Sequence, residues 1–321
     1  MMKATKMDKY TQKAKIWANK RFRKCDEQGI YYAHQPIYGF QKNHSEPRLL
    51  GKYILTFQIM KAFSHLRFDS LLDVGAAEGY KVYLAKELFN VKVKGCDLSE
   101  EACQRAKEIF NIESIVADIH NLPFKDNEFD VVLCSEALEH VTDIAKAVEE
   151  LLRVARKAIV ITVPHDSKKT VEQNIKRGVF SHIHSFDLKS FNFLKRAGYN
   201  VFSKKMVSPL LYKIPLALIA AKPKKHYKNM KYPKICVDIY NVCVPILRKL
   251  FGKRTTIFLI QLDKWLCRFT FFYEAELFII LKNRQYYTKK ESINVSAGQI
   301  VGFAVPYHYL KKKSSSIFRR A

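Results

Sequence analysis

The chain has 321 residues, enough to bury a full core, and 48% of them are hydrophobic and 27% charged, as in soluble globular proteins. Its formal net charge of +26 is uneven: residues 1–70 contribute +9, residues 71–208 contribute zero and residues 209–321 contribute +17. No apolar stretch approaches the roughly 18–20 residues that cross a bilayer, which excludes a helical membrane span. The pattern indicates a neutral core with basic flanks that face an anionic partner, either nucleic acid or a membrane surface.

The cysteines and the N-terminus indicate the cellular compartment. The seven cysteines are scattered and form no Cys-x-x-Cys pair, which predicts reduced thiols in a cytosolic protein. Charges run throughout the N-terminal residues, so no secretory signal is expected. We therefore expect a cytoplasmic protein, with peripheral attachment to the inner face of a membrane as a further possibility; the oligomeric state stays open.

The chain begins with a basic segment, residues 1–52, that we interpret as an N-terminal cap. Residues 1–30 are expected to be helical, and residues 31–48 form an aromatic stretch punctuated by proline and glycine. Apolar residues at helical spacing predict a helix from Tyr53 to Leu66. The core of the protein is expected to occupy residues 53–208.

Short apolar runs then alternate with helical patterns. The expected strands are Leu71–Val74, Val91–Asp97, Ser114–Ala117, Phe129–Cys134, Ala158–Val163 and Val201–Met206. Ser99 is expected to cap a helix that runs through Phe110, and Asp187 a helix that ends at Gly198. The alternation predicts an α/β fold with a mainly parallel sheet covered by helices on both faces.

The first strand leads into small residues, Gly75-Ala-Ala-Glu-Gly79, and then into a helix from Tyr80 to Phe89. A strand, a glycine turn and a helix are typical of a nucleotide-binding unit. The glycines let the backbone approach a ligand, and the helix start presents free N–H groups.

Ligands of such sheets bind at the carboxyl ends of the strands. The residues expected there are Gly75 to Gly79, Asp97, Asp118, Ser135, Glu136, Pro164 and His165. Asp97 follows the glycine turn by about 20 residues, the spacing of an acidic residue that binds the ribose hydroxyls. Asp118 is placed to accept a hydrogen bond from an adenine amino group.

These motifs resemble those of class I S-adenosylmethionine-dependent methyltransferases, and of the type 11-like group in particular, over residues 45–208. The segment from Asp73 to Gly79 resembles the first motif of that family, and Asp97 its ribose-binding acid. Ala117-Asp118-Ile119 resembles its adenine-binding segment. Ala77 departs from the family, since many relatives have glycine there. NAD is the second choice of nucleotide, because the turn lacks the spacing G-x-G-x-x-G.

The resemblance implies a Rossmann-like, doubly wound sheet of seven strands whose last strand is antiparallel. It also implies S-adenosyl-L-methionine as the cofactor. The implied cofactor-binding residues are Asp73, Gly75, Ala77, Gly79, Asp97, Leu98, Asp118, Ile119 and Ser135.

The seventh strand is expected far along the chain, at Glu276–Leu281 within a core segment 275–284. Residues 209–274 are therefore interpreted as a basic, amphipathic helical insertion between strands six and seven. Its apolar runs alternate with lysines, which suits a helix at an anionic membrane surface, a lid packed on the sheet, or an RNA-binding lid. Residues 285–321 are expected to form a basic, disordered tail.

Candidate catalytic residues follow strand four and precede the late helix. Glu136, Glu139 and His140 share one face if the helix has begun, and His182 and His184 lie in a His-x-His segment. We take Glu136, His140, His182 and His184 as candidates for catalysis or substrate positioning. A structural role is the alternative, because a helix dipole alone favours Glu at this place and the histidines could only pin a loop.

A metal site is a further hypothesis. Glu136, Glu139, His140 and His184 would hold a divalent ion such as Mg²⁺. Similar arrangements occur in metal-dependent O-methyltransferases of ubiquinone synthesis and in enzymes that methylate small-RNA 3′ termini. The ion would orient acceptor hydroxyls and ease their deprotonation.

Two absences narrow the acceptor. Strand four is not followed by Asn-Pro-Pro-Tyr, which argues against methylation of base amino groups, and no Pro-Cys pair occurs, which argues against the cysteine-adduct route to carbon methylation. The leading hypothesis is therefore O-methylation of a membrane-associated small molecule, a quinone precursor or a lipid-linked glycan, with an activated ring carbon as a further acceptor. An RNA methyltransferase and a non-catalytic binding module with this fold are the alternatives.

Overall fold

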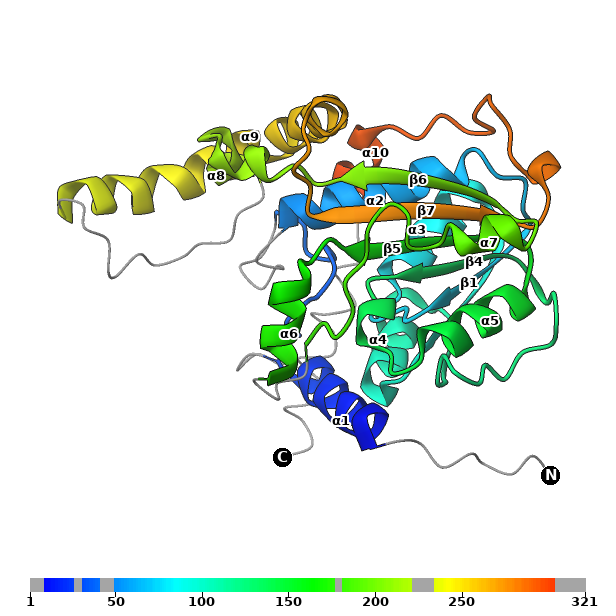
Figure 1. Ribbon diagram of the computed structural model, residues 1–321. Coiled ribbons are helices and arrows are strands. Elements are labelled where there is room, and N and C mark those ends of the chain that lie inside the picture. The colour runs from blue at the N-terminus through cyan, green and yellow to red at the C-terminus, as the bar shows by residue number, and fades with distance from the viewer. Residues whose placement is uncertain (1–8, 26–30, 41–48, 177–180, 221–233, 304–321) are drawn as a thin grey trace.

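The computed structural model describes residues 9–25, 31–40, 49–176, 181–220 and 234–303. A sheet of seven strands in the order β3-β2-β1-β4-β5-β7-β6 forms its centre (Figure 1). The first five strands are parallel, whereas β7 runs antiparallel to both β5 and β6. The expected fold class, a mainly parallel seven-stranded sheet with an antiparallel last strand, is confirmed.

The strands lie close to the expected ranges. They are β1 (Ser70–Val74), β2 (Lys92–Asp97), β3 (Ser114–Val116), β4 (Phe129–Ser135), β5 (Ala155–Pro164), β6 (Asn200–Met206) and β7 (Ala275–Leu281). β5 begins earlier than expected because Ala155 pairs with Phe129 ahead of an irregularity in the register.

Helices cover both faces of the sheet. The α-helices are α1 (Lys9–Arg23), α2 (Leu49–Phe63), α3 (Tyr80–Phe89), α4 (Glu100–Phe110), α5 (Ile144–Val154), α6 (Lys168–Lys176), α7 (Phe193–Arg196), α8 (Leu216–Ala220), α9 (Lys234–Phe269) and α10 (Ala297–Gly302). Three 3₁₀ turns are η1 (Leu138–His140), η2 (Pro209–Lys213) and η3 (Arg284–Tyr286). Successive strand residues alternate between two cores: Leu71 packs with α2 and α3, and Leu72 packs with α5.

One expected helix cap is present and one is not. The Ser99 hydroxyl accepts a hydrogen bond from the N–H of Ala102 and begins α4 as expected. The Asp187 carboxylate instead accepts from the N–H of Lys189 at 2.8 Å in a local turn, so the regular helix shrinks to α7.

The cap segment is joined to the core by a buried ion pair. The Arg105 guanidinium is 1% exposed and donates to the carbonyl oxygens of Tyr32 and Lys24, at 3.1 and 3.2 Å. It lies 3.6 Å from the buried Glu78 carboxylate, which accepts from the N–H of His34 at 2.6 Å. Arg105 and Glu78 in the core therefore obtain hydrogen-bond partners from the backbone of the cap segment.

The segment between β6 and β7 is helical and leaves the sheet. η2, α8 and α9 lie there, and the long α9 projects past the sheet (Figure 1). Near its C-terminal end, Leu259 and Ile260 are buried, and the Asp263 carboxylate accepts from the N–H groups of Val207 and Ser208. Among the described residues, no helix combines the length and the apolarity needed to cross a membrane.

The expected disordered tail needs a correction. Residues 285–303 are folded, since η3 and α10 lie there and Val295, Ile300 and Val301 are buried in the core. Ser296 and Gln299 form a capping box at the start of α10. The basic composition of this segment hid its apolar positions at helical spacing; residues 304–321 lie outside the described part of the chain.

Candidate functional site

A cavity of about 470 Å³ opens at the carboxyl ends of the parallel strands. Its floor is made of residues that follow β1, β2, β3 and β4. Helix α1 and the start of α2 supply part of its wall, and His182, Val207, Tyr212 and Glu274 line it as well. Helix α1 is held over the cavity by polar contacts to α4: the Lys15 ammonium lies 2.8 Å from Glu100, and the Asn19 side chain accepts from Ser99 at 2.7 Å.

The glycine turn forms one edge of the cavity. Gly75 has a φ of +80°, and a Cβ at this position would lie 2.9 Å from the Ala137 side chain, so only glycine fits. Ala77 has a φ of 50°, a left-handed conformation that strains a residue with a Cβ. Gly75 and Ala77 line the cavity. Gly79, which was expected to bind the cofactor, lies behind these two residues. It precedes α3 and packs on Ala106 of α4.

Asp97 is held rigidly at the end of β2. One carboxylate oxygen accepts from the N–H of Ala77 and the other from the N–H of Ser99, both at 2.9 Å. Burial raises the pKa of this carboxyl, and the backbone N–H donors, those of Ser99 and Ala77 foremost, oppose the rise. Asp97 and the adjoining Leu98 both line the cavity.

The next strand end supplies Asp118 and Ile119, which also line the cavity. The Asp118 carboxylate accepts from both the backbone N–H and the ring of His120, at 3.0 and 2.7 Å. His120 was not singled out from the sequence, although its place two residues after an acid at a strand end was a usable signal. The four expected residues at the ends of β2 and β3 therefore lie together.

Beneath the glycine turn lies a buried polar group that was only partly foreseen. Both Asp73 carboxylate oxygens lack a hydrogen-bond partner, and burial raises the pKa of Asp73 to about 7, opposed by Lys81 and supported by Asp97. The buried Lys81 ammonium donates to the Ser135 hydroxyl at 2.8 Å, and Ser135 in turn contacts the Thr162 hydroxyl at 2.7 Å. Burial lowers the pKa of Lys81, and Asp73 opposes the shift.

Of this group, Ser135 and Lys81 line the cavity, and Asp73 lies below it. Lys81 was missed in the sequence. A lysine on the buried face of the helix after a glycine turn was the signal available for it.

The expectation of one helical face for Glu136, Glu139 and His140 is wrong. Glu136, the residue after β4, has a left-handed φ of 57°, and its N–H still donates to the Thr162 carbonyl of β5, so no helix has begun there. The 3₁₀ turn η1 begins only at Leu138. The Glu136 side chain lines the cavity with one oxygen 4.0 Å from the Lys52 ammonium.

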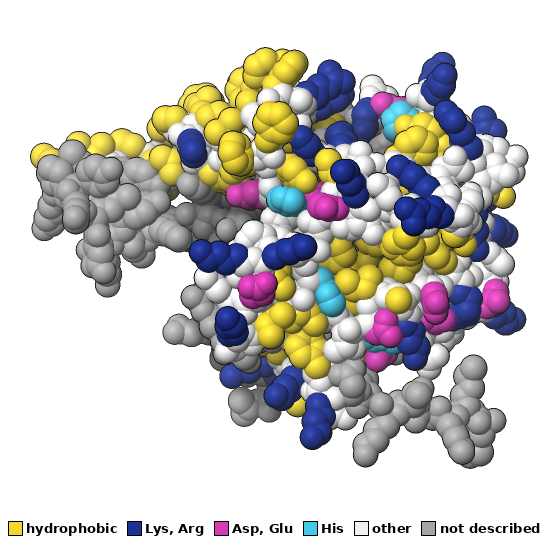
Figure 2. Space-filling view, in the orientation of Figure 1, with side chains coloured by type: hydrophobic (Ala, Val, Ile, Leu, Met, Phe, Trp, Pro, Cys, Tyr) yellow, Lys and Arg dark blue, Asp and Glu magenta, His cyan; other side chains and the backbone are white. Residues whose placement is uncertain are grey.

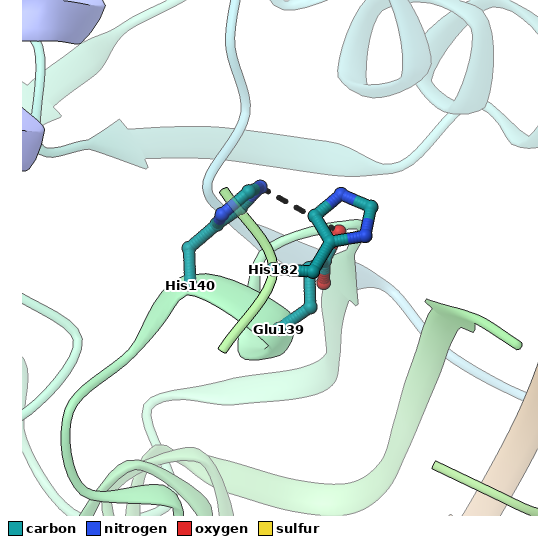
Figure 3. Close-up of side chains that lie close together, drawn as sticks. All are labelled: Glu139, His140 and His182. Atoms are coloured by element: carbon teal, nitrogen blue, oxygen red, sulfur yellow. Dashed lines mark ion pairs between the residues drawn. The ribbon is translucent and has the colours of Figure 1, made fainter. Parts of the chain in front are cut away.

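Glu139, His140 and His182 come together on the cavity wall (Figure 3). One potential ligand atom from each lies within 4.8 Å of the others. The Glu139 side chain is buried, its Oε2 has no hydrogen-bond partner, and burial followed by the neighbouring Glu136 raises its pKa well above the ordinary range.

The outer nitrogens of the two imidazoles are already bonded. His140 Nδ1 donates to the Ser181 carbonyl at 3.2 Å, and His182 Nδ1 donates to the Asp166 carboxylate. Burial, then His182, lowers the pKa of His140 to about 4, so its ring is neutral near pH 7 and Nε2 carries a lone pair. Asp166, not predicted from the sequence, orients His182.

His184 lies apart from this cluster. Its Nε2 donates to the Val141 carbonyl at 2.6 Å, and it does not line the cavity. Among the described residues, the group with metal-ligand spacing contains His182 in place of the expected His184 and does not include Glu136. Residues 182 and 184 would face the same way in a regular strand, but the backbone here is irregular, and His184 turns toward Val141 instead.

Comparisons with known proteins agree with this geometry. Residues 72–161 match the family model described as a methyltransferase domain. An uncharacterized protein of Methanocaldococcus jannaschii, MJ0638, is 30% identical over 179 residues, which cover 53% of this chain and 73% of that protein.

Two relatives whose names state an activity match over shorter stretches. Norajmaline N-methyltransferase of Rauvolfia serpentina is 35% identical over 29% of this chain and 35% of its own length. A ubiquinone/menaquinone biosynthesis C-methyltransferase of Rickettsia prowazekii is 30% identical over 43% of this chain and 57% of its own length. The matches to these two proteins thus span from about a third to just over half of their lengths. With its strand order, glycine turn and strand-end acids, the chain belongs to the class I S-adenosylmethionine-dependent methyltransferase family.

Proposed function

We propose that the protein transfers the methyl group of S-adenosyl-L-methionine to a hydroxyl group of a small membrane-associated molecule, a quinone precursor in preference to a lipid-linked glycan. Family membership supports the methyl donor. Relatives named for ubiquinone, menaquinone and 2-phytyl-1,4-naphthoquinone support the acceptor class. The observation that carries the proposal is the Glu139–His140–His182 cluster, which faces the same cavity as Asp97.

The cavity fits the proposed donor. Each Asp97 oxygen uses one acceptor position on a backbone N–H, which leaves capacity on both oxygens for the two hydroxyls of a ribose. Gly75 packs closely against Ala137 and lines the cavity at the end of β1, and Asp118 lines it at the end of β3 for an adenine amino group. When bound, S-adenosyl-L-methionine supplies an electrophilic methyl group on a positively charged sulfur.

The protein must hold the acceptor hydroxyl in line with that methyl group and remove its proton. His182 is suited to accept the proton, because Asp166 fixes its ring and would stabilise the imidazolium that forms. His140 presents Nε2, 3.8 Å from Glu139 Oε1, to the same space. Helix α1 covers the cavity and limits the access of water.

The same three side chains support a divalent cation. His140, whose ring is neutral, His182 and the buried Glu139 side chain bring potential ligand atoms within 4.8 Å of one another, and the outer nitrogens of both rings are bonded as in metal-ligating histidines. Two nitrogen ligands suit zinc, iron or another first-row transition ion better than Mg²⁺, which prefers oxygen. Such an ion would make the acceptor hydroxyl more acidic.

Labelling with radioactive S-adenosylmethionine tests the function. The full-length protein is incubated with a cell extract, which is then separated into lipid, RNA and protein fractions. We expect label in the lipid fraction, lost in a His182→Ala variant that still binds S-adenosylmethionine. Label in RNA that disappears on nuclease treatment would instead support the RNA alternative, and failure to bind the donor in calorimetry would support a binding module.

Chelation tests the cation separately. A metal-stripped preparation is expected to lose turnover and to regain it on addition of Zn²⁺, Fe²⁺ or Mn²⁺ more readily than Mg²⁺. Unchanged turnover after chelation would leave His182 and Asp166 as a metal-independent base. The metal content of the purified protein, compared with that of a Glu139→Gln/His140→Ala variant, gives a readout that does not depend on activity.

A further inference from the structure

The C-terminal end of α9 and the turn after it carry an unusual set of exposed aromatic residues. Trp265, Phe269, Phe271 and Phe272 are 57%, 68%, 88% and 72% exposed, and we call them the aromatic edge. The rings of Trp265 and Phe269 lie 5.0 Å apart. Contiguous exposed apolar residues of this size mark interaction sites in soluble proteins.

The aromatic edge is held in place by the body of the protein. The Lys205 ammonium, on β6, donates to the Thr270 carbonyl at 3.3 Å and lies 5.5 Å from the Phe271 ring centre. The Asp263 carboxylate, about two turns earlier in α9, accepts hydrogen bonds from the N–H groups of Val207 and Ser208. The rings are therefore presented by a fixed turn.

Basic residues accompany the aromatic edge. Lys264 and Arg268 are exposed between its members on α9, and Lys249, Lys253 and Arg254 are exposed further back along the helix. Residues 209–274 contain thirteen lysines and arginines against three acidic residues, of which Asp263 is buried. An apolar surface bordered by positive charge complements an anionic one that accepts apolar groups.

The remaining exposed side chains of α9 favour lipid over nucleic acid. Ile239, Val242, Ile246 and Leu250 are each more than half exposed along the same helix. Aliphatic side chains do not stack on bases, whereas both they and aromatic rings enter the interfacial region of a bilayer. Figure 2 shows hydrophobic side chains gathered over α9, with lysines and arginines beside them.

We propose that the aromatic edge and the exposed face of α9 dock on an anionic lipid bilayer, without crossing it. Phe272 lies two residues before Glu274, which lines the cavity; Tyr212 lines it from the other end of the insertion, and Val207 lines it from just before the insertion. Docking therefore brings one wall of the cavity close to the lipid. Only the purpose of docking, delivery of a lipid-soluble acceptor, rests on the proposed function.

Vesicle flotation with the full-length protein tests the docking. The vesicles are phosphatidylcholine alone or phosphatidylcholine mixed with phosphatidylserine, at low and high salt. The wild-type protein is expected to float with the anionic vesicles at low salt. A Phe269→Ser/Phe271→Ser/Phe272→Ser variant is expected to bind them at least about tenfold more weakly, because each ring loses its burial in lipid. Lys264→Glu/Arg268→Glu is expected to have a loss of similar size.

A matched control lies in α7, where Phe193 and Lys195 are also exposed. Phe193→Ser/Lys195→Glu is expected to float like the wild type. Circular dichroism and S-adenosylmethionine binding should be the same for all variants, so a folding defect is recognised. Flotation requires neither donor nor acceptor, which keeps this test apart from the methylation test.

Three outcomes would overturn the docking proposal. The first is wild-type protein that ignores anionic vesicles at low salt. The second is edge variants that float as well as the wild type. The third is an aromatic edge that binds something else. This would be RNA, if RNA binding is lost in the same variants, or a second copy of the chain, if sedimentation shows a dimer that the edge variants abolish.

Discussion

The strand ends and the α9 helix are built on opposite plans. At the strand ends, the Asp97 and Asp118 carboxylates are each fixed by hydrogen bonds from neighbouring residues, and the surrounding segment 71–208 carries no net charge. On α9, large apolar side chains face solvent, and the charged residues around them are mainly basic. A site whose polar groups are already held by hydrogen bonds suits a small ligand. A surface with exposed apolar side chains suits a larger partner.

The largest effect should come from the strand ends. Asp97→Ala removes the acceptor that fixes Ala77 and Ser99 and that would hold the ribose. Two charge-assisted hydrogen bonds are lost, each worth about 1.5–3 kcal/mol, so S-adenosylmethionine affinity should fall by at least about 100-fold in calorimetry. Glu113→Ala, at an exposed ion pair with Lys94, is the control and should change affinity by less than about twofold. Unchanged affinity in Asp97→Ala would disprove the cofactor assignment.

The Phe269→Ser/Phe271→Ser/Phe272→Ser variant tests the other region. It should leave the affinity for S-adenosylmethionine unchanged. The two regions would then be separable: one binds the donor and the other the surface. A joint loss of both would show that α9 shapes the cavity.

A second prediction concerns the residue behind His182. Asp166→Asn keeps the shape of the side chain but removes the charge that stabilises a protonated His182. The turnover rate is expected to fall by about 10- to 100-fold, the usual effect of removing a carboxylate that is hydrogen-bonded to a catalytic or metal-binding histidine. The affinity for S-adenosylmethionine should not change. Asp187→Asn, in an exposed turn, serves as the control. If only the affinity for S-adenosylmethionine fell, Asp166 would have a structural role in the loop and no role in methyl transfer.

A third prediction uses the buried Asp73. Its pKa of about 7 in the folded protein exceeds the ordinary value of 3.8, so the native state holds this proton more tightly than the unfolded chain does. The stability due to Asp73 is full below about pH 4 and is lost as the pH rises through 7. Asp73→Asn should flatten this decline by at most about 1.4 kcal/mol per pH unit in denaturant titrations.

Lys81 and Asp97 are the charged groups that act on Asp73, so Asp126→Asn, remote and exposed, is the control. A decline as steep in Asp73→Asn as in the wild type would mean that Asp73 is ionised in the native state throughout this range.

The smallest expected effect is at Ala77. Its left-handed φ of 50° strains an alanine, and glycine adopts this conformation freely. Ala77→Gly should raise the free energy of unfolding by about 0.5–1 kcal/mol after the entropy of the unfolded glycine is subtracted. Ala76→Gly, at the neighbouring buried position, should instead destabilise. A loss of stability in Ala77→Gly would show that the cavity wall needs the Ala77 methyl group.

The sequence predicted the parallel strands and their ends well, for a physical reason. Strands buried on both faces are continuous apolar runs, and the residue that ends each run must lie at one edge of the sheet. Asp97 and Asp118 needed further signals, because β2 contains two lysines and β3 is short: Asp97 was placed by its spacing of about 20 residues from the glycine turn, and both by the resemblance to the family motifs. The antiparallel β7 was likewise recognisable, because Ala275–Leu281 is almost wholly apolar.

Irregular backbone was harder to predict. The positive φ of Glu136 delays the turn η1, and nothing in the local sequence forces that conformation. His182 and His184 are equivalent in pattern, and only the loop path from Ser181 to Phe186 decides which one meets Glu139. Lys81 and Asp166 make their contacts through the tertiary fold, with residues 54 and 16 positions away. Periodicity carries no information at that range.

Arg105 has a consequence for how the protein can be divided. The segment that matches the family model, residues 72–161, contains both Arg105 and Glu78, but the carbonyls and the N–H that complete their hydrogen bonds belong to Lys24, Tyr32 and His34. A shortened chain without its first forty residues would strip these groups of their neutral partners. We therefore expect that residues 72–161 do not fold on their own, and that α1 and the sheet unfold in a single transition.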